Sequence, residues 1–412
     1  MHRRVSQIAL LLVLQVALVL GGPAGPAAAL SPEQQLLSEA WRIVNRSYVD
    51  DKFNHHNWWS IREKAVKQPL KDREQTYTGI QQMLANLDDP FTRLLKPEQY
   101  RSLQVNTSGE LTGVGLQIAI DQKSGTLTVV APVAGSPADQ AGIQPLDRIL
   151  KIDGTPTSEL SLDEAATRMR GRIGTPVTLT LGREGRDSPV EIELLRDRIA
   201  LNPVYAALQS GPENLPVGYI RLSQFSANAT TEVAHAIDQL EKQGAAAYIL
   251  DLRNNPGGLL QAGIEIARLW LDSGTIVYTV NRQGILGSFE ASGEALTNDP
   301  LIVLVNKGTA SASEILAGAL QDNGRAQLVG EKTFGKGLIQ SLFDLSDGSG
   351  LAVTVAKYET PNHTDIHKLG ISPDRVVPLQ PIALAKFGSK DDLQYQAALQ
   401  LLKEQTVMAK SA

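Results

Sequence analysis

The distribution of hydrophobic and polar residues changes twice along the chain, which predicts three structural regions. In residues 31–103 apolar side chains recur at the spacing of an α-helix. The first helix is expected to begin at Ser31, an N-cap residue followed by Pro32 at the first helical position. Two more helices are expected over 54–67 and 73–86. The apolar residues at helical spacing are Leu36, Leu37, Ala40, Trp41, Val44 and Tyr48. Trp41, Trp58 and Trp59 are expected in the core or at a domain contact rather than at a ligand site.

Residues 104–197 contain short stretches of alternating apolar and polar residues, separated by glycine-containing turns. This pattern is typical of β-strands, and an Asp-Gly turn at 153–154 ends one of them. A short helix is expected over 136–142, where Gly142 provides the stop. The other expected elements are strands over 113–120, 127–130, 147–154, 176–182 and 190–196 and a helix over 162–170.

Residues 198–380 alternate between buried-strand patterns and helical patterns. Such alternation predicts a sheet with helices packed against it, and therefore an α/β fold. A final helix is expected over 391–403. The strands are expected over 217–222, 246–252, 276–280, 300–305 and 351–358, and the helices over 230–243, 259–271 and 311–320.

The composition is that of a soluble globular protein. Of the 412 residues, 42% are hydrophobic and 20% are charged, and the net charge is −5. The length predicts two or three domains, and the charge gives no basic surface for nucleic acid. There is no cysteine, which excludes disulfides, thiolate catalysis and cysteine metal sites.

The N-terminus has the three parts of a secretory signal. A positive start at residues 2–4 precedes an apolar stretch over 8–20 and a small, proline-containing segment over 21–29. The apolar stretch is short for a membrane-spanning helix, which needs about 20 residues. We therefore expect residues 1–29 to be removed and the mature protein to be soluble outside the cytoplasm. The alternative is an uncleaved membrane anchor.

Ser311 and Lys336 indicate an activity most directly. They lie in Thr-Ala-Ser-Ala-Ser-Glu (309–314) and Thr-Phe-Gly-Lys-Gly (333–337). A serine hydroxyl is a weak nucleophile until a base takes its proton, and a lysine becomes that base when burial disfavours its charged form. Ser311 is expected beyond the carboxyl end of the strand that finishes at Val305, where α/β sheets place their active sites. The alternative is a tight turn and an exposed loop charge without catalytic roles.

Stabilising the oxyanion of acyl transfer also requires N–H donors. The N–H of Ala312 is one candidate, because a helix N-terminus carries partial positive charge. The segment Asp-Leu-Arg-Asn-Asn-Pro-Gly-Gly (251–258) would expose further amides at Gly257 and Gly258 before a helix. A glycine-rich turn without a catalytic role is the alternative for this loop.

Histidine offers two competing schemes. A Ser/His/Asp triad would need a histidine near Ser311, and only His363 and His367 are placed to approach it. Together with Asp365 these two histidines would also suit a metal ion. We expect neither scheme, and we expect no metal and no cofactor.

The segments around Ser311 and Lys336 resemble those of the carboxyl-terminal processing proteases, which are serine endopeptidases with a Ser/Lys dyad. In that family the lysine follows the nucleophile by 25 residues, as Lys336 follows Ser311, whereas Ser313 would miss this spacing. Gly-Ile-Ser-Pro-Asp at 370–374 matches too. The resemblance implies that Gln340 assists Lys336 by a hydrogen bond, that the Gly-Gly loop faces the nucleophile, and that no metal is required. From the residues alone, the alternative for Gln340 is a strand residue that faces solvent.

The sequences GVGLQI (113–118) and SPADQAGIQPLDRILKIDG (136–154) resemble a PDZ domain. Such domains bind a peptide C-terminus as an added strand and hold its carboxylate in a nest of backbone N–H groups. The resemblance places that nest in a loop formed by Leu111, Thr112, Gly113, Val114 and Gly115.

Three further stretches look like the photosynthetic branch of the family: AWRIVNRSYVDDKFN, GIQQMLANLDDPFTRLL and ELTGVGLQIAI. Its members trim the C-terminal extension of the photosystem II reaction-centre precursor in the thylakoid lumen. The resemblance therefore implies an exported endopeptidase, in the lumen or periplasm, that acts on protein C-terminal tails, including that of a membrane-protein precursor. A general periplasmic tail-specific protease and a non-enzymatic PDZ adaptor are the alternatives.

The expected fold class is a multidomain α/β protein, and nucleic acid is not an expected partner. The expected divisions are a signal peptide at 1–29, a helical N-terminal domain at 30–103, a PDZ domain at 104–197, an α/β catalytic domain at 198–385, and a C-terminal helix and tail at 386–412.

Overall fold

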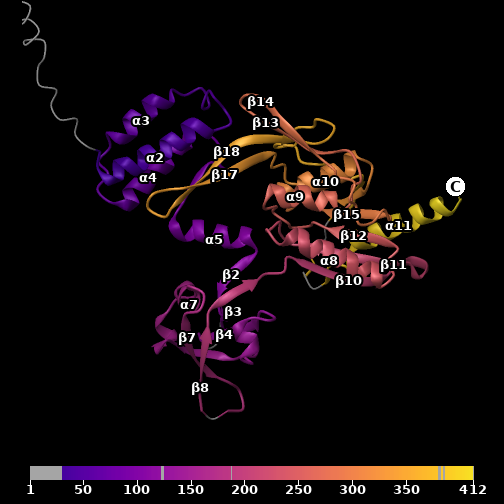
Figure 1. The fold of residues 1–412 in the computed structure, drawn as a ribbon, viewed down its shortest axis with the longest axis horizontal. Coiled ribbons are helices and arrows are strands. Elements are labelled where there is room, and N and C mark those ends of the chain that lie inside the picture. The colour runs from indigo at the N-terminus through magenta and orange to yellow at the C-terminus, as the bar shows by residue number, and fades with distance from the viewer. Residues whose placement is uncertain (1–29, 122–124, 187, 379–381, 384–385, 412) are drawn as a thin grey trace, which may run out of the picture.

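The computed structural model describes residues 30–121, 125–186, 188–378, 382–383 and 386–411. Figure 1 shows a helical region, a β-rich region that projects from the body of the molecule, and an α/β region that ends in a long helix. The signal peptide expected over 1–29 lies outside the described residues. Of the helices that are described, none is long and apolar enough to cross a membrane.

The helical region packs three helices around one apolar core. These are α2 (Pro32–Ser47), α3 (Trp58–Val66) and α4 (Arg73–Ala85). A side chain at each N-cap accepts a backbone N–H and fixes where the helix begins. The expected burial is confirmed for Trp41 and Trp58 but is wrong for Trp59, which is 61% exposed. Adjacent residues of a helix point in different directions, so Trp58 and Trp59 cannot both enter this core. Trp59 lies at its rim, where its ring centroid is 4.5 Å from that of Trp41.

The β-rich region is an antiparallel sheet of order β3-β4-β5-β7-β8, with β6 paired to β5. The elements are β3 (Leu116–Ile120), β4 (Leu127–Pro132), α6 (Pro137–Gln140), β5 (Arg148–Ile152), β6 (Thr155–Pro156), α7 (Leu162–Met169), β7 (Pro176–Gly182) and β8 (Val190–Leu195). Alternate strand residues such as Val129, Ile149 and Leu179 are buried beneath α7 and form the core of this region.

A two-stranded ribbon connects the β-rich region to the rest of the chain. β2 (Glu110–Gly113) follows α5 (Pro97–Ser108) and pairs antiparallel with β9 (Asp197–Ala200). The expected loop over 111–115 is therefore wrong at its first three positions, which lie in β2. The partner strand is distant in sequence, so the local pattern did not reveal the pairing.

The α/β region is built on a sheet of order β10-β11-β12-β15-β16-β19. All neighbours are parallel except β10, which is antiparallel to β11. The strands are β10 (Val204–Ser210), β11 (Pro216–Leu222), β12 (Ala247–Asp251), β15 (Leu301–Val305), β16 (Gln327–Gly330) and β19 (Arg375–Val376). The helices are α8 (Ala229–Lys242), α9 (Leu260–Arg268), α10 (Ala312–Asp322) and α11 (Leu393–Ser411). The predicted α/β fold is confirmed.

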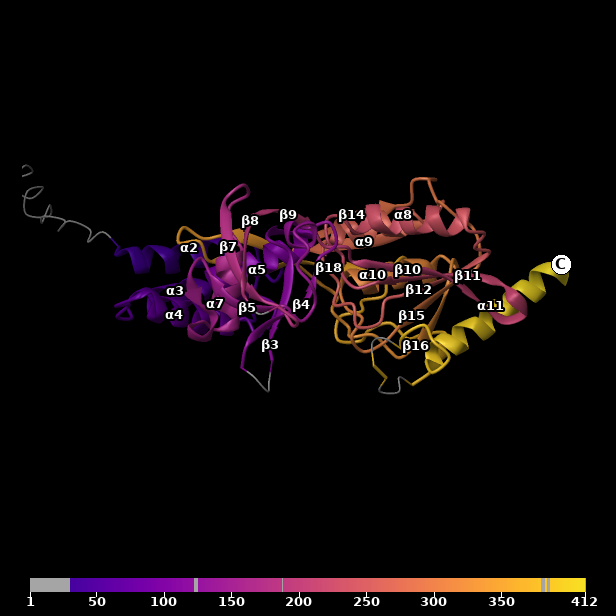
Figure 2. The same ribbon diagram turned by 90° about the horizontal axis from the view of Figure 1, so that it is seen from below.

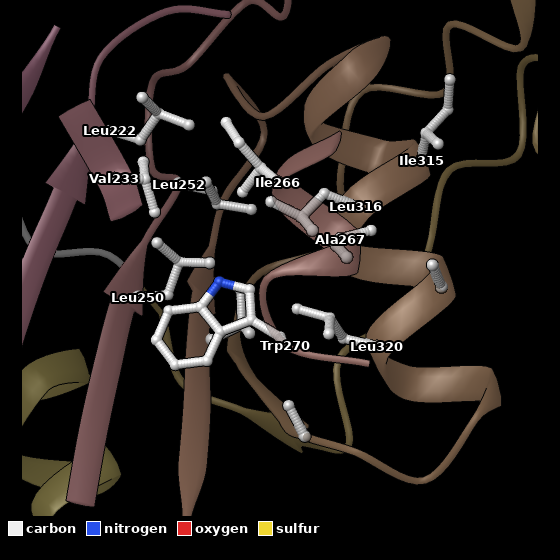
Figure 3. Close-up of a cluster of buried hydrophobic side chains, with 14 of the residues drawn as sticks. Leu222, Val233, Leu250, Leu252, Ile266, Ala267, Trp270, Ile315, Leu316 and Leu320 are labelled. Carbon is white, nitrogen blue, oxygen red and sulfur yellow. The ribbon is translucent and has the colours of Figure 1, made fainter. Parts of the chain in front are cut away.

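Helices cover both faces of this sheet (Figures 1 and 2). One face packs on α8, α9 and α10, and the opposite face packs on α11 through Tyr395, Ala398 and Leu402. Figure 3 shows Trp270 between the sheet and the helices α9 and α10, beside Leu250. The Trp270 side chain is fully buried. The central strands β12 and β15 are buried on both faces, which explains their nearly continuous apolar sequences.

A second sheet links the α/β region to the helical region. Its order is β1-β18-β13-β14, and β17 also pairs with β18. The bounds are β1 (Arg93–Leu95), β13 (Thr275–Asn281), β14 (Gly284–Glu290), β17 (Leu338–Asp344) and β18 (Gly350–Glu359). Leu351 and Val353 of β18 belong to the apolar core of the helical region. This sheet therefore fixes the helical region beside the segment that precedes β17, which contains Lys336.

Candidate active site

Two loops meet at the carboxyl edge of the α/β sheet. β12 and β15 are parallel neighbours, so the chain leaves both at the same edge. Gly257 follows β12 and Ser311 follows β15. A Cβ atom built on Gly257 would lie 2.8 Å from Ser311 Cβ and 2.9 Å from the Ala312 nitrogen. The fold thus brings the Gly-Gly loop against Ser311, and only glycine fits at position 257.

Ser311 has an unusual backbone conformation. Its φ is 59° and its ψ is −120°, a combination that L-residues adopt rarely and that is typical of strained functional turns. Its N–H donates to Glu314 Oε2 at 2.9 Å, and its carbonyl accepts the N–H groups of Glu314 and Ile315. These bonds hold the serine at the start of α10 in spite of the strain.

The Glu314 carboxylate joins the two catalytic candidates. It is fully buried, and it accepts hydrogen bonds from the backbone N–H groups of both Ser311 and Lys336, each at 2.9 Å. It also accepts the Gly335 N–H at 2.7 Å and the Thr333 hydroxyl at 2.5 Å. One side chain therefore fixes the loop of Lys336 relative to the turn of Ser311. No role for Glu314 was predicted from the sequence, although an acid among the apolar residues of a helix is a usable signal.

Tyr358 adds a second link of the same kind, which the sequence analysis also missed. Its hydroxyl lies 2.5 Å from the Lys336 carbonyl and 3.1 Å from the Ser311 carbonyl, so its proton is shared between the two oxygens. Burial raises the pKa of the Tyr358 hydroxyl well above its ordinary value, and the nearby Glu314 raises it further. The hydroxyl therefore remains a hydrogen-bond donor at any working pH.

Lys336 lies in surroundings that favour its neutral form. Burial lowers the pKa of its amine below the ordinary lysine value, and the positive charge of Arg93 lowers it further, while Asp89 and Glu314 act in the opposite direction. Its Nζ lies over the ring of Phe91, 4.9 Å from the centroid. Within the described chain no hydrogen bond joins this Nζ to Ser311, and the two residues are linked through their backbone atoms by Glu314.

Gln340 does not make the expected hydrogen bond to Lys336 in this conformation. Its Nε2 donates instead to the Thr354 hydroxyl, at 3.4 Å. The pairing of β17 with β18 places Gln340 opposite Thr354, next to a register shift, and this explains the contact. Its catalytic role stays a prediction.

The candidate oxyanion donors differ in their availability. The Gly257 N–H already donates to Asn255 Oδ1 at 2.9 Å. The N–H groups of Gly258 and Ala312 have no hydrogen-bond partner among the described residues. Of the three predicted donors, the latter two therefore keep an N–H that no described protein group uses, although Ala312 itself is buried.

Comparison with known proteins identifies the family. Residues 216–377 match the model of peptidase family S41, and residues 128–183 match a PDZ domain. A carboxyl-terminal-processing protease of Synechocystis sp. is 65% identical over 390 residues, which are 95% of this chain and 91% of the relative. The chain belongs to the carboxyl-terminal-processing proteases. It is therefore a protease of the S41 family that carries a PDZ domain, and the predicted family, activity class and PDZ domain are confirmed.

Plant and structural relatives agree with this assignment. The chloroplastic carboxyl-terminal-processing peptidase 2 of Arabidopsis thaliana is 47% identical, over 86% of this chain and 70% of the relative. A solved structure titled photosystem II D1 C-terminal processing protease is 42% identical, with a TM-score of 0.56. That alignment covers 90% of this chain and 97% of the solved one. The protease is thus similar along nearly its whole length to enzymes of photosynthetic organisms.

The PDZ residues expected to bind a carboxylate occupy the end of β2 and the turn that follows. Leu111, Thr112 and Gly113 pair with β9, and Val114 and Gly115 form the turn into β3. The Gly115 carbonyl accepts the Val133 N–H and the Ser136 hydroxyl, which closes this turn against α6. A Cβ on Gly115 would lie 2.2 Å from Ser136, so the turn requires glycine.

A large cleft lies beside this part of the PDZ domain. Its volume is about 1880 Å³, and it lies between the helical region and the PDZ domain of the protease. Thr92 and Arg93 line one wall, and Leu111, Thr112 and Arg170 line the other. Asp89 and Arg93, the two charged groups of the helical region that act on the pKa of Lys336, are among its lining residues, whereas Ser311 and Lys336 are not.

The two histidines do not form a triad with Ser311. His363 stacks on Tyr278 and contacts Glu359 through Nδ1 at 3.0 Å. His367 packs against Gly337, and burial lowers the pKa of its imidazole. Among the residues that the structure describes, no three His, Asp or Glu side chains gather as a metal site would require.

The Glu314 carboxylate gives a first testable prediction. Glu314→Gln keeps the shape of the side chain but replaces one carboxylate oxygen by an NH₂ group, which is itself a donor. Three backbone N–H groups and one hydroxyl donate to this carboxylate in the wild type. We expect kcat/KM to fall on the order of 100-fold and the free energy of unfolding to fall by about 1.5–3 kcal/mol, because hydrogen bonds to a charged acceptor are lost. The measurements are peptide cleavage and denaturant unfolding. Glu331→Gln, which affects only a partly exposed pair with Lys307, is the control. Wild-type kinetics for Glu314→Gln would contradict the positioning role.

Proposed function

We propose that this protease cleaves C-terminal extensions by nucleophilic catalysis, with Ser311 as the nucleophile and Lys336 as the general base. The observation that carries the proposal is the single buried Glu314 carboxylate, which binds the backbone of both residues at the carboxyl edge of the sheet. The depressed pKa of the Lys336 amine supports the same assignment, since a base must be neutral to accept a proton.

The reaction would proceed in two stages. Lys336 takes the proton of the Ser311 hydroxyl as the oxygen attacks the scissile carbonyl, and the oxyanion binds the N–H of Ala312 and that of Gly258 or Gly257. Lys336 then gives its proton to the leaving amine, which departs and leaves an ester on Ser311. In the second stage Lys336 activates water, which hydrolyses the ester and releases the shortened protein. Gln340 would orient Lys336 after a change of rotamer.

The proposed substrate is the unstructured C-terminal tail of a protein. Its carboxylate would bind where β2 ends at Gly113 and turns at Gly115, and the chain would run from there to Ser311. The similarity to a structure titled photosystem II D1 C-terminal processing protease favours the precursor of that membrane protein as the natural substrate. We further propose that the protease is exported to the thylakoid lumen or the periplasm, as the sequence of residues 1–29 suggests.

The direct test is to incubate the mature protease with a synthetic peptide of the D1 C-terminal extension and to locate the cut by mass spectrometry. A single internal cut at one bond is the expected result. A peptide of the same composition in scrambled order, but with the same last residues, is the control. Equal cleavage of both peptides would indicate a general tail-specific protease, and no cleavage of either would overturn the proposed substrate class.

The PDZ domain gives a prediction about the free carboxylate of the substrate. One peptide is compared as the free acid and as the C-terminal amide. We expect the amide to raise KM at least about tenfold, because a charge-assisted set of hydrogen bonds is lost on binding. Gly115→Ala should produce the same loss with the acid peptide and no further loss with the amide. Equal kcat/KM for acid and amide would remove any carboxylate-reading role from the PDZ domain.

A further inference from the structure

The aromatic ring that contacts the Lys336 amine comes from the helical region rather than from the α/β sheet. The Lys336 Nζ lies 4.9 Å from the centroid of the Phe91 ring, within the reach of a cation–π contact. Phe91 is half-buried and lies in the short connection between α4 and β1.

Hydrogen bonds hold this connection to β18. The Phe91 N–H donates to Asp89 Oδ1 at 2.9 Å, and the Thr92 hydroxyl donates to Asp89 Oδ2 at 2.7 Å. The Thr92 oxygen also accepts the buried Thr354 N–H at 3.0 Å. Directly afterwards, β1 pairs with β18 from Arg93 onwards. The ring is therefore placed by the same strand that pairs with β17, just beyond Lys336.

We propose that Phe91 is a positioning residue for Lys336: its ring covers the side-chain amine, excludes water from it, and holds it in place within the site. This inference rests on the proposed role of Lys336 as the base. It makes the helical region a contributor to the active site as well as a support for the second sheet.

The Phe91 ring has two opposite effects on the proton affinity of the Lys336 amine, and different substitutions of Phe91 separate them. Its bulk keeps water away from the amine, which favours the neutral form. Its face attracts the ammonium form. The charged groups that act on Lys336 are Asp89 and Arg93 from the helical region and Glu314 from α10, and substitution of Phe91 retains all three. The pH profile therefore reports on the ring itself.

The experiment measures kcat and KM against pH for the mature protease with the D1-extension peptide. In Phe91→Ala the amine becomes hydrated, its pKa rises, and the rising limb of kcat/KM should move to higher pH by about one unit. The kcat at neutral pH should fall on the order of 10- to 100-fold, with little change in KM. In Phe91→Leu an apolar side chain still keeps water from the amine, but no aromatic face attracts the ammonium form. The pKa of Lys336 should therefore fall, and the rising limb of kcat/KM should move to lower pH by about half a unit. Phe91→Tyr should behave as the wild type.

Phe343→Leu is the matched control, because Phe343 is also half-buried and packs at the same junction with the helical region, away from Lys336. Phe343→Leu should leave the rising limb of kcat/KM at the same pH as in the wild type. If Phe91→Ala does not fold, the shift to lower pH in Phe91→Leu carries the test. An unchanged pH profile of kcat/KM in Phe91→Leu, or a shift no larger than that of Phe343→Leu, overturns this inference. If Lys336→Ala is inactive in the same assay, the proposed dyad still stands. Activity in Lys336→Ala overturns both.

Discussion

Replacing Ser311 or Lys336 by alanine should abolish peptide cleavage. The loss of kcat/KM is expected to be on the order of 10⁴- to 10⁶-fold for each, and the double variant should lose little more, because nucleophile and base act as one unit. Lys336→Arg should fail equally, since arginine keeps its proton at neutral pH and cannot serve as a base. Kinetics with the free-acid peptide provide the measurement, and tail binding, followed by fluorescence anisotropy, should survive in every variant.

Ser313→Ala is the internal control for this result. The Ser313 hydroxyl is buried and donates to the Asn255 carbonyl at 3.0 Å, which also accepts the Ala310 N–H. When the Ser313 hydroxyl is removed, the Asn255 carbonyl still accepts the Ala310 N–H. We therefore expect a stability loss of about 1 kcal/mol and nearly normal turnover. Near wild-type turnover in Lys336→Ala would disprove the dyad, and an inactive Ser313→Ala beside an active Ser311→Ala would move the nucleophile.

Replacing Arg253 should produce the largest loss of stability. Its guanidinium is fully buried and donates to Asp251 and Asp392, with shortest distances of 2.6 and 2.7 Å. It also lies over the Phe387 ring, 4.2 Å from the centroid. These contacts join the end of β12, where the Gly-Gly loop begins, to the segment that precedes α11. Arg253 therefore holds the candidate oxyanion loop and the C-terminal helix to the same point of the sheet.

Arg253→Met should lower the free energy of unfolding by about 3–5 kcal/mol, because two buried carboxylates lose their partner. Thermal and denaturant unfolding measure this loss. Lys386→Met removes an exposed pair with Asp391 in the same C-terminal segment and should change stability by less than about 1 kcal/mol. Adding Asp392→Asn to Arg253→Met should recover part of the loss, since one unpaired charge disappears. A loss in Arg253→Met no greater than that of the control would contradict this account.

Local sequence patterns were sufficient for the elements that bury an apolar face by themselves. The capping box at Ser31 and the apolar spacing behind it predicted α2, and the continuous apolar runs at 246–252 and 300–305 predicted the central strands β12 and β15. The strands that the analysis missed, such as β1, β9 and β17, are defined by partners far along the chain. Their residues alternate weakly, and their pairing becomes visible only when the sheet is assembled.

The sequence by itself determined the candidates for the chemistry, because Ser311, Lys336 and the Gly-Gly loop lie in recognisable segments. Only the tertiary structure decided how those segments are held. Glu314 and Tyr358 link the serine and the lysine through backbone atoms, and Phe91 reaches the lysine from another region. Such contacts depend on the position of a side chain in three dimensions, for which the linear spacing of residues carries no signal.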